Sequence, residues 1–235
     1  MEGEAFASFD PVWERRYSDN PAYRNKYPFT SVVQFVFKHR PADRSPSDTN
    51  ILEVGCGNGC NLWFAAREGF KVAGIDASST AVEYARQWFG RDGLTGDLQV
   101  GDYTALPFDN DTFQLVIDRG ALSFCGRAAV EKAFSEISRV LVADGRFMFT
   151  PYSDRCSSFD GLQDEDGCYR NVSVGTIVPG AQIRFYCLDE VRRLFRTGWR
   201  IITLEHQEYT SFDKPFRIVH AEWLVIAEKL GVPKS

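Results

Sequence analysis

A short apolar strand that runs directly into a glycine-rich turn constrains the fold of this chain more than any other feature. The stretch Asn50-Ile-Leu-Glu-Val-Gly-Cys-Gly-Asn-Gly59 reads as that strand and turn, a helical pattern follows, and a second apolar run ends at Asp76. This order is typical of a βαβ unit that binds a nucleoside. Glycine lets the backbone approach a ligand where a Cβ would collide. A carboxylate at the end of the second strand can accept hydrogen bonds from ribose hydroxyls.

The spacing of the glycines indicates which nucleoside such a unit would bind. The dinucleotide fingerprint G-x-G-x-x-G/A, counted from Gly55 and Gly57, requires Gly or Ala where this chain has Cys60. The pattern here is E-x-G-x-G-x-G, which begins at Glu53 and ends at Gly59. In this form it resembles motif I of the class I S-adenosylmethionine-dependent methyltransferases. A NAD-binding Rossmann oxidoreductase is the alternative that the spacing disfavours.

Carboxylates also follow the next two predicted strands, at Asp102 and Asp118. The resemblance implies that Asp76 binds the ribose hydroxyls, Asp102 the adenine amino group and Glu53 the α-amino group of the cofactor. It also implies that the turn at 118–120 lies beside the transferred methyl group. The full set of cofactor contacts expected from the resemblance is Glu53, Gly55, Cys56, Gly57, Asn58, Gly59, Asp76, Ala77, Asp102, Tyr103, Asp118, Arg119, Gly120, Tyr17 and Tyr27.

Hydrophobic patterning after residue 50 alternates strands with helices. This alternation predicts an α/β fold with a doubly wound, seven-stranded, mostly parallel sheet, an antiparallel last strand and an N-terminal helical lid. A loop of about a dozen residues joins the final two strands, which favours antiparallel pairing there. Strands are expected near 51–54, 71–75, 98–101, 113–117, 146–150, 199–205 and 218–227, and helices near 59–68, 79–89, 127–141 and 188–195.

The chain of 235 residues is expected to form a single domain. Its parts are an aromatic helical cap and linker (1–49), a cofactor-binding half (50–150), an insertion (151–187) and the rest of the sheet (188–235). The insertion is polar and rich in glycine, and so long a connection is commonly functional or mobile. We expect the cap and the insertion to form the acceptor pocket together, with Phe159, Tyr169 and Tyr186 as apolar walls.

Methyl transfer from a sulfonium is an in-line displacement, so positioning and exclusion of water are the main tasks of such an enzyme. A general base is needed only for a hydroxyl, a thiol or a protonated amine. Weak candidates for a catalytic residue are His220, Tyr152 and Arg119. No metal site is expected, because the six cysteines form no C-x-x-C pair and the acidic run Asp164-Glu-Asp166 suits a solvated loop.

The composition of the chain limits the kinds of binding partner that it is expected to have. The net charge of −5 offers no basic face for nucleic acid, and no apolar run is long enough to span a membrane. The N-terminus lacks a signal-peptide pattern, which predicts a cytoplasmic protein, and we expect a monomer or homodimer. The expected function is metal-independent O-, N- or S-methylation of a small molecule, with S-adenosylhomocysteine as product. A protein substrate is disfavoured, and a non-catalytic S-adenosylmethionine-binding protein is a further alternative.

Overall fold

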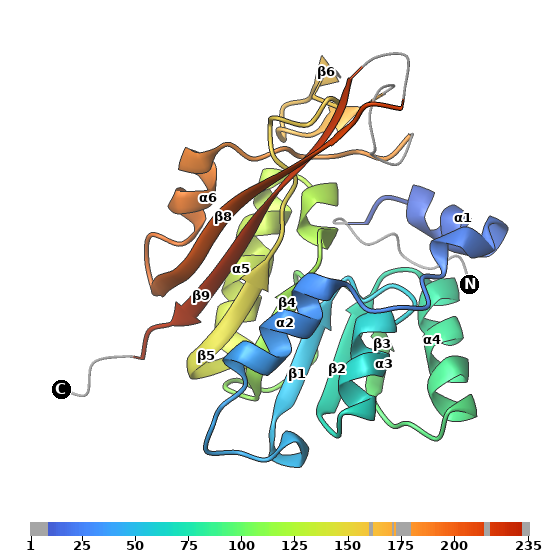
Figure 1. The fold of residues 1–235 in the computed structure, drawn as a ribbon, viewed down its shortest axis with the longest axis vertical. Coiled ribbons are helices and arrows are strands. Elements are labelled where there is room, and N and C mark those ends of the chain that lie inside the picture. Colours follow the sequence, from blue (N-terminus) through green and yellow to red (C-terminus); the bar gives the residue numbers. More distant parts are fainter. Residues whose placement is uncertain (1–8, 160–161, 171, 173–179, 214–216, 232–235) are drawn as a thin grey trace.

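The computed structural model describes residues 9–159, 162–170, 172, 180–213 and 217–231, and its main feature is a seven-stranded sheet (Figure 1). The strands lie in the order β3-β2-β1-β4-β5-β9-β8. Their bounds are β1 (Asn50–Val54), β2 (Lys71–Asp76), β3 (Asp97–Val100), β4 (Phe113–Asp118), β5 (Leu141–Phe149), β8 (Trp199–Ser211) and β9 (Ile218–Lys229).

Pairing within this sheet confirms the predicted fold class. Strands β1 to β5 pair in parallel, whereas β9 runs antiparallel to both β5 and β8. The chain moves outward from β1 through β2 to β3 and then returns to place β4 against the other side of β1. Strand order therefore reverses between β1 and β4, and ligands bind outside the carboxyl ends of the strands at such a point.

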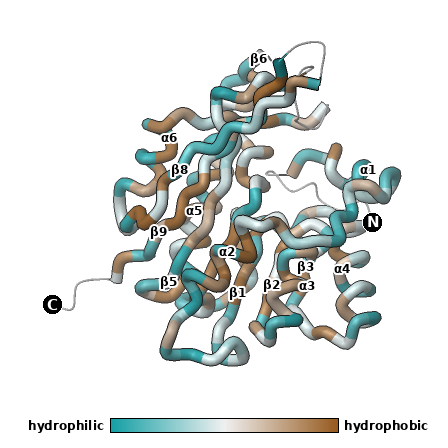
Figure 2. Tube along the Cα trace, viewed as in Figure 1, coloured by the Kyte–Doolittle hydropathy of each residue, from teal (hydrophilic) through white to brown (hydrophobic). Residues whose placement is uncertain are grey.

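Helices cover both faces of the sheet. On one face, α2 (Thr30–His39), α3 (Cys60–Arg67) and α4 (Ser79–Arg91) bury apolar side chains in a core that includes Ile51. On the other face, α5 (Arg127–Val140) and α6 (Leu188–Leu194) pack on a core that includes Leu52. Successive strand residues point to opposite faces. Figure 2 shows hydrophobic residues along the central strand β1, whereas the outer half of β8 is hydrophilic. Neither face of the parallel strands is left open.

Short elements complete the described chain: α1 (Val12–Asp19), β6 (Leu162–Gln163), β7 (Tyr169–Arg170) and the 3-10 helices η1 (Pro21–Tyr23), η2 (Pro46–Asp48) and η3 (Ala121–Phe124). The described part of the insertion is therefore more ordered than its composition suggests. Strands β6 and β7 pair with each other, and Tyr169 exchanges backbone hydrogen bonds of 2.6 and 2.9 Å with Ile183. Two glycines of this glycine-rich insertion, Gly161 and Gly175, lie outside the described residues.

Three strands, β5, β8 and β9, have bounds that differ from the sequence expectation. Strand β5 begins at Leu141, because Leu141 pairs with Phe113 and the strand then passes through an irregular step at Asp144, whose φ is +61°. Asp144 and Gly145 thus form an irregularity within β5. Strands β8 and β9 are both longer than expected and extend as a hairpin beyond the sheet (Figure 1). None of the described helices is long and apolar enough to cross a membrane.

Candidate cofactor and acceptor site

A cavity of about 400 Å³ opens at the carboxyl ends of β1, β2 and β4. Its size is within the range of small-molecule and cofactor pockets. Most of the residues that the sequence assigned to the cofactor line it, as do the three weak catalytic candidates. These lining residues are Glu53, Gly55, Cys56, Gly57, Asn58, Asp76, Ala77, Tyr103, Arg119, Gly120, Tyr17, Tyr152 and His220.

Four expected cofactor residues are not among those that line the cavity, and two of them have structural roles. Gly59 precedes α3 with a φ of +77°, and a Cβ there would lie 3.1 Å from the Cβ of Ala85, so this glycine allows close packing against α4. Asp102 folds back on its own turn, where its Oδ1 accepts a hydrogen bond of 2.8 Å from the Thr104 amide.

The other two lie on opposite sides of the cavity boundary. Asp118 is fully buried beneath the turn after β4, where its Oδ1 accepts a hydrogen bond of 2.9 Å from the Leu122 amide. Tyr27 lies on the outside: its side chain is 69% exposed, and the Lys26 ammonium contacts its ring. The expectation that Tyr27 covers the cofactor is not supported by this position.

The glycine turn follows β1 because its backbone must bend sharply into α3. Gly57 has a φ of +52°, which favours glycine over any residue with a Cβ. A Cβ at Gly57 would lie 2.3 Å from the hydroxyl oxygen of Tyr17, which reaches down from α1. The Tyr17 hydroxyl therefore limits the free space beside Gly57 on the cavity side of the turn.

Asp76 ends β2 and bonds to two backbone amides. Its Oδ2 accepts a hydrogen bond of 2.8 Å from the Gly57 amide, and its Oδ1 accepts one of 2.8 Å from the Ser78 amide. The carboxylate therefore joins the glycine turn to the start of α4. A carboxylate oxygen has two lone pairs, so each oxygen can still accept a ligand hydroxyl.

Glu53 is held by Asn61, a residue that the sequence reasoning missed. The Asn61 amide nitrogen donates a 2.7 Å hydrogen bond to Glu53 Oε1, and its Oδ1 accepts one of 3.0 Å from the Phe29 amide. Glu53 is only 2% exposed, and its Oε2 has no hydrogen-bond partner among the described residues. A polar residue in the first turn of an otherwise apolar helix is the one sequence signal that pointed to Asn61.

Burial controls the protonation of the three carboxyl groups around the turn. It raises the pKa of Glu53 to about 8, an effect that the nearby Asp118 and Asp76 carboxylates reinforce and the Asn61 hydrogen bond opposes. Burial also raises the pKa of Asp76 to about 6 and that of Asp118 to about 7, against the opposing effect of their backbone hydrogen bonds. A cation entering the cavity would therefore favour ionisation of these groups.

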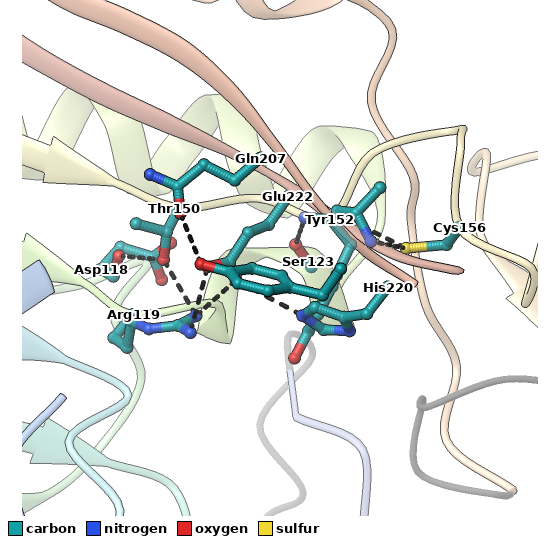
Figure 3. A network of polar contacts seen from close by, with 11 residues as sticks. Asp118, Arg119, Ser123, Thr150, Tyr152, Cys156, Gln207, His220 and Glu222 are labelled. Carbon is teal, nitrogen blue, oxygen red and sulfur yellow. Dashed lines mark hydrogen bonds and ion pairs between the residues drawn. The ribbon is translucent and has the colours of Figure 1, made fainter. Parts of the chain in front are cut away.

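At the far end of the cavity, side chains that follow β4 and β5 or lie on β9 point toward one another in Figure 3. The Arg119 guanidinium forms an ion pair of 3.1 Å with Glu222 and a 3.4 Å hydrogen bond to the Thr150 hydroxyl. His220 Nε2 lies 3.7 Å from Glu222 Oε2. The Tyr152 ring meets the His220 ring edge to face, with centroids 5.5 Å apart.

The N-terminal segment covers the cavity, as the predicted lid would. Glu14 of α1 accepts a 2.6 Å hydrogen bond from the Ser78 hydroxyl and further bonds from Thr80 at the start of α4. Trp13 packs edge to face on Phe124, with centroids 4.7 Å apart. Sequence reasoning did not assign the following lining residues to the site: Asp10, Asn25, Asn61, Ala121 and Phe124.

The aromatic residues expected from the insertion do not line the cavity. Phe159 and Tyr169 pack against each other with centroids 4.9 Å apart, and Tyr169 also contacts Phe185. Tyr186 is fully buried and donates a 3.2 Å hydrogen bond to the Leu122 carbonyl. Burial of apolar surface stabilises these positions instead: Tyr186 belongs to the core of the sheet, where it contacts Phe149, and Tyr169 packs on a smaller cluster that includes Phe185. In the described part of the chain, no group of three or more His, Cys, Asp or Glu side chains could hold a metal ion.

Comparison with known proteins finds similarity to methyltransferases. Residues 51–145 match the family model of a methyltransferase domain. A solved S-adenosylmethionine-dependent methyltransferase from Methanosarcina mazei superposes with a TM-score of 0.69 at 18% identity, over 83% of this chain and 97% of that one. Residues 51–145 thus match a methyltransferase domain, and the fold is that of solved S-adenosylmethionine-dependent methyltransferases. This similarity agrees with the family expected from the glycine turn and the strand-end carboxylates.

Curated relatives of this chain have different names. Human EEF1A lysine methyltransferase 2 is 32% identical over 127 residues, which is 51% of this chain and 52% of the relative. Malonyl-[acyl-carrier protein] O-methyltransferase from Geobacter sulfurreducens is 29% identical over 170 residues, which is 69% of this chain and 60% of the relative. The chain spans about half the length of the first of these relatives.

The cavity fits the charges of the cofactor that is named for the similar solved methyltransferases. S-adenosylmethionine carries a sulfonium and an α-ammonium group, and the unpartnered Oε2 of Glu53 is a buried acceptor at the cavity wall. Tyr17 and Trp13 add aromatic faces, which attract cations. Asp76 supplies the carboxylate oxygens that a ribose diol requires.

Proposed function

We propose that this methyltransferase transfers a methyl group from S-adenosylmethionine to a small-molecule acceptor, without a metal ion. One observation carries the proposal: a single cavity runs from the glycine turn and Asp76 to the polar group of Arg119, Tyr152 and His220. The first end has the carboxylates that suit the cofactor. The second end is open to a further molecule.

Each residue would have a defined task in binding. Glu53 would accept hydrogen bonds from the α-ammonium group, and Asp76 would accept them from the ribose hydroxyls. Tyr103, which lines the cavity after β3, would lie beside the adenine ring. The bound cofactor supplies an electrophilic methyl carbon on a positively charged sulfur. The chain itself would bind, orient and dehydrate the two reactants, which lowers the barrier to displacement.

A small acceptor agrees with the way in which the cavity is covered. Helix α1 is bonded to the start of α4 through Glu14, and Trp13 of the same helix contacts Phe124. The acceptor end is therefore bounded by aromatic side chains from α1 and η3. A lysine side chain of a protein is the second candidate acceptor, because the human relative is named as a lysine methyltransferase.

A transfer assay with labelled cofactor tests the proposal. The purified protein would be incubated with methyl-labelled S-adenosylmethionine and, separately, with the small-molecule and the protein fractions of a cell extract. We expect label in a small molecule, identified by mass analysis, and none with the Gly57→Val variant, in which the branched side chain would meet Tyr17. Label confined to the protein fraction would favour a lysine side chain of a protein as the acceptor. The absence of transfer to both fractions, with intact cofactor binding, would favour a non-catalytic binding protein.

A further inference from the structure

His220 lies where a proton acceptor for the second substrate would have to lie. It lines the cavity, and its side chain is 25% exposed, so a proton taken up in the cavity could leave to solvent. Its ring is fixed edge to face against Tyr152, at an interplanar angle of 83°. The ring is therefore both oriented and able to exchange protons.

Glu222 is placed to orient this imidazole. The two residues are separated by one position on β9 and therefore share a face of the strand, with His220 Nε2 and Glu222 Oε2 3.7 Å apart. Burial alone would raise the pKa of Glu222, but the contacts with His220 and Arg119 lower it below the usual value. Glu222 is thus an ionised, 8% exposed carboxylate. A neighbouring carboxylate of this kind stabilises an imidazolium as it forms.

The walls beside His220 are aromatic. Trp13, Phe124 and Tyr152 meet in successive edge-to-face contacts, with centroids 4.7 and 5.8 Å apart. Gly120 adjoins Tyr152 in the cavity wall: a Cβ placed there would lie 3.9 Å from the Tyr152 hydroxyl. A planar ring suits such walls, because aromatic side chains gain most from stacked and edge-to-face contacts.

The geometry points to a phenol-type acceptor, an aromatic ring that carries a hydroxyl, with His220 as the catalytic base and Glu222 as its positioning residue. This inference rests on the proposed function. As the acceptor oxygen bonds to the methyl carbon, the carbon–sulfur bond breaks and its electron pair stays on sulfur, which gives neutral S-adenosylhomocysteine. The hydroxyl proton passes to the His220 imidazole. The resulting imidazolium, opposite Glu222, then releases the proton to solvent.

Three probes that share a ring and differ in the attacking atom test this assignment. Phenol needs a base to attack, whereas thiophenol is largely ionised at mildly alkaline pH and aniline attacks through its neutral lone pair. Methyl transfer from labelled cofactor would be measured with each probe for the wild type and for His220→Gln, which keeps a donor toward Glu222 but cannot accept the proton. We expect His220→Gln to lower phenol methylation about 10²–10⁴-fold and to leave thiophenol methylation nearly unchanged.

The matched control is His206→Gln. His206 lies on β8 and contacts the Ser153 hydroxyl and the Trp223 ring, and it is not among the residues that line the cavity. This variant should methylate all three probes as the wild type does. An equal loss for all three probes in His220→Gln would show a structural role and overturn the assignment. Failure of the wild type to methylate any probe, with cofactor bound, would overturn the acceptor class. A failure to bind the cofactor would instead defeat the proposed function itself.

Discussion

At the scale of single residues, the site depends on the protonation of buried carboxyl groups. Glu53 has a pKa of about 8 because it is buried, and its Oε2 has no partner in the described chain. It is therefore mostly protonated at neutral pH when no ligand is present. A bound ammonium group would supply the missing partner and favour the ionised form.

Cofactor binding should consequently release protons. We expect calorimetric titrations with S-adenosylmethionine at about pH 7, in buffers of different ionisation enthalpy, to show net proton release by the wild type. Glu53→Gln, which can still accept the Asn61 hydrogen bond, should bind more weakly and release fewer protons. Identical proton release by both proteins would remove Glu53 from the ammonium site.

Gly57 provides a second test at the residue scale. Gly57→Ala places a Cβ 2.3 Å from the Tyr17 hydroxyl and also strains the backbone at a φ of +52°. Gly93→Ala is the matched control, because its φ is +67° but no atom lies within 4 Å of the added Cβ. Both variants should lose about 1–2 kcal/mol of stability through backbone strain. Only Gly57→Ala should lose cofactor affinity, by tenfold or more for about 1.4 kcal/mol, and equal affinities in the two variants would contradict this.

At the scale of elements, α1 is held over the cavity by a small number of polar contacts. Glu14 bonds to Ser78 and Thr80 at the start of α4, where the helix dipole also favours a negative charge. Burial raises the Glu14 pKa, but these hydrogen bonds outweigh it and lower the value. Asp10 fastens the other end of the segment, since its Oδ2 accepts a 2.7 Å hydrogen bond from the Gln182 amide.

Loosening α1 should change the rate at which the cofactor leaves. We expect Glu14→Ala to increase the dissociation rate of S-adenosylhomocysteine several-fold, because its loss removes hydrogen bonds that contribute about 1.5–3 kcal/mol each when charged. Stopped-flow displacement would measure the rate. Arg15→Ala, on an exposed position of the same helix, is the control. An unchanged rate in Glu14→Ala would mean that α1 does not limit release.

The elements also show what the sequence could and could not predict. Asp76 and the glycine turn were predictable because strand, turn and helix signals are local, and topology then places strand ends together. Asn61 and Asp10 were not assigned to the site, because their roles depend on contacts with segments far along the chain. Tyr27 and Tyr186 do not line the cavity, since aromatic character alone does not say whether a side chain faces solvent, a cavity or the core.

At the scale of the whole molecule, the buried carboxyls make stability depend on pH. For Glu53 and Asp118, the pKa in the folded chain is raised to about 8 and about 7. A carboxyl group whose pKa is raised on folding contributes its full stabilisation at pH values below its pKa in the unfolded chain. This contribution is lost as the pH rises through its pKa in the folded chain. His39, whose pKa burial and nearby cations lower, acts in the opposite sense but only below about pH 6.5.

Without cofactor, the free energy of unfolding should therefore fall as pH rises from about 7 to about 8.5, by at most about 1.4 kcal/mol per pH unit for each group. Urea unfolding at a series of pH values measures this slope. Glu53→Gln should flatten it, because the glutamine cannot ionise. A stability that is constant or rises over this range in the wild type would show that the carboxyls ionise freely in the fold.

The most direct test of the account is a calorimetric titration of the wild type and Asp76→Asn with S-adenosylmethionine, S-adenosylhomocysteine and NAD. We expect one molecule of either adenosyl compound to bind the wild type and NAD to give no binding heat. Asp76→Asn keeps an acceptor for the Ser78 amide but loses the charge toward the ribose, so its affinity should fall at least tenfold, as expected for the loss of about 1.4 kcal/mol or more. Binding of NAD in place of S-adenosylmethionine, or equal affinity in the variant, would show that Asp76 and this cavity do not hold the methyl donor.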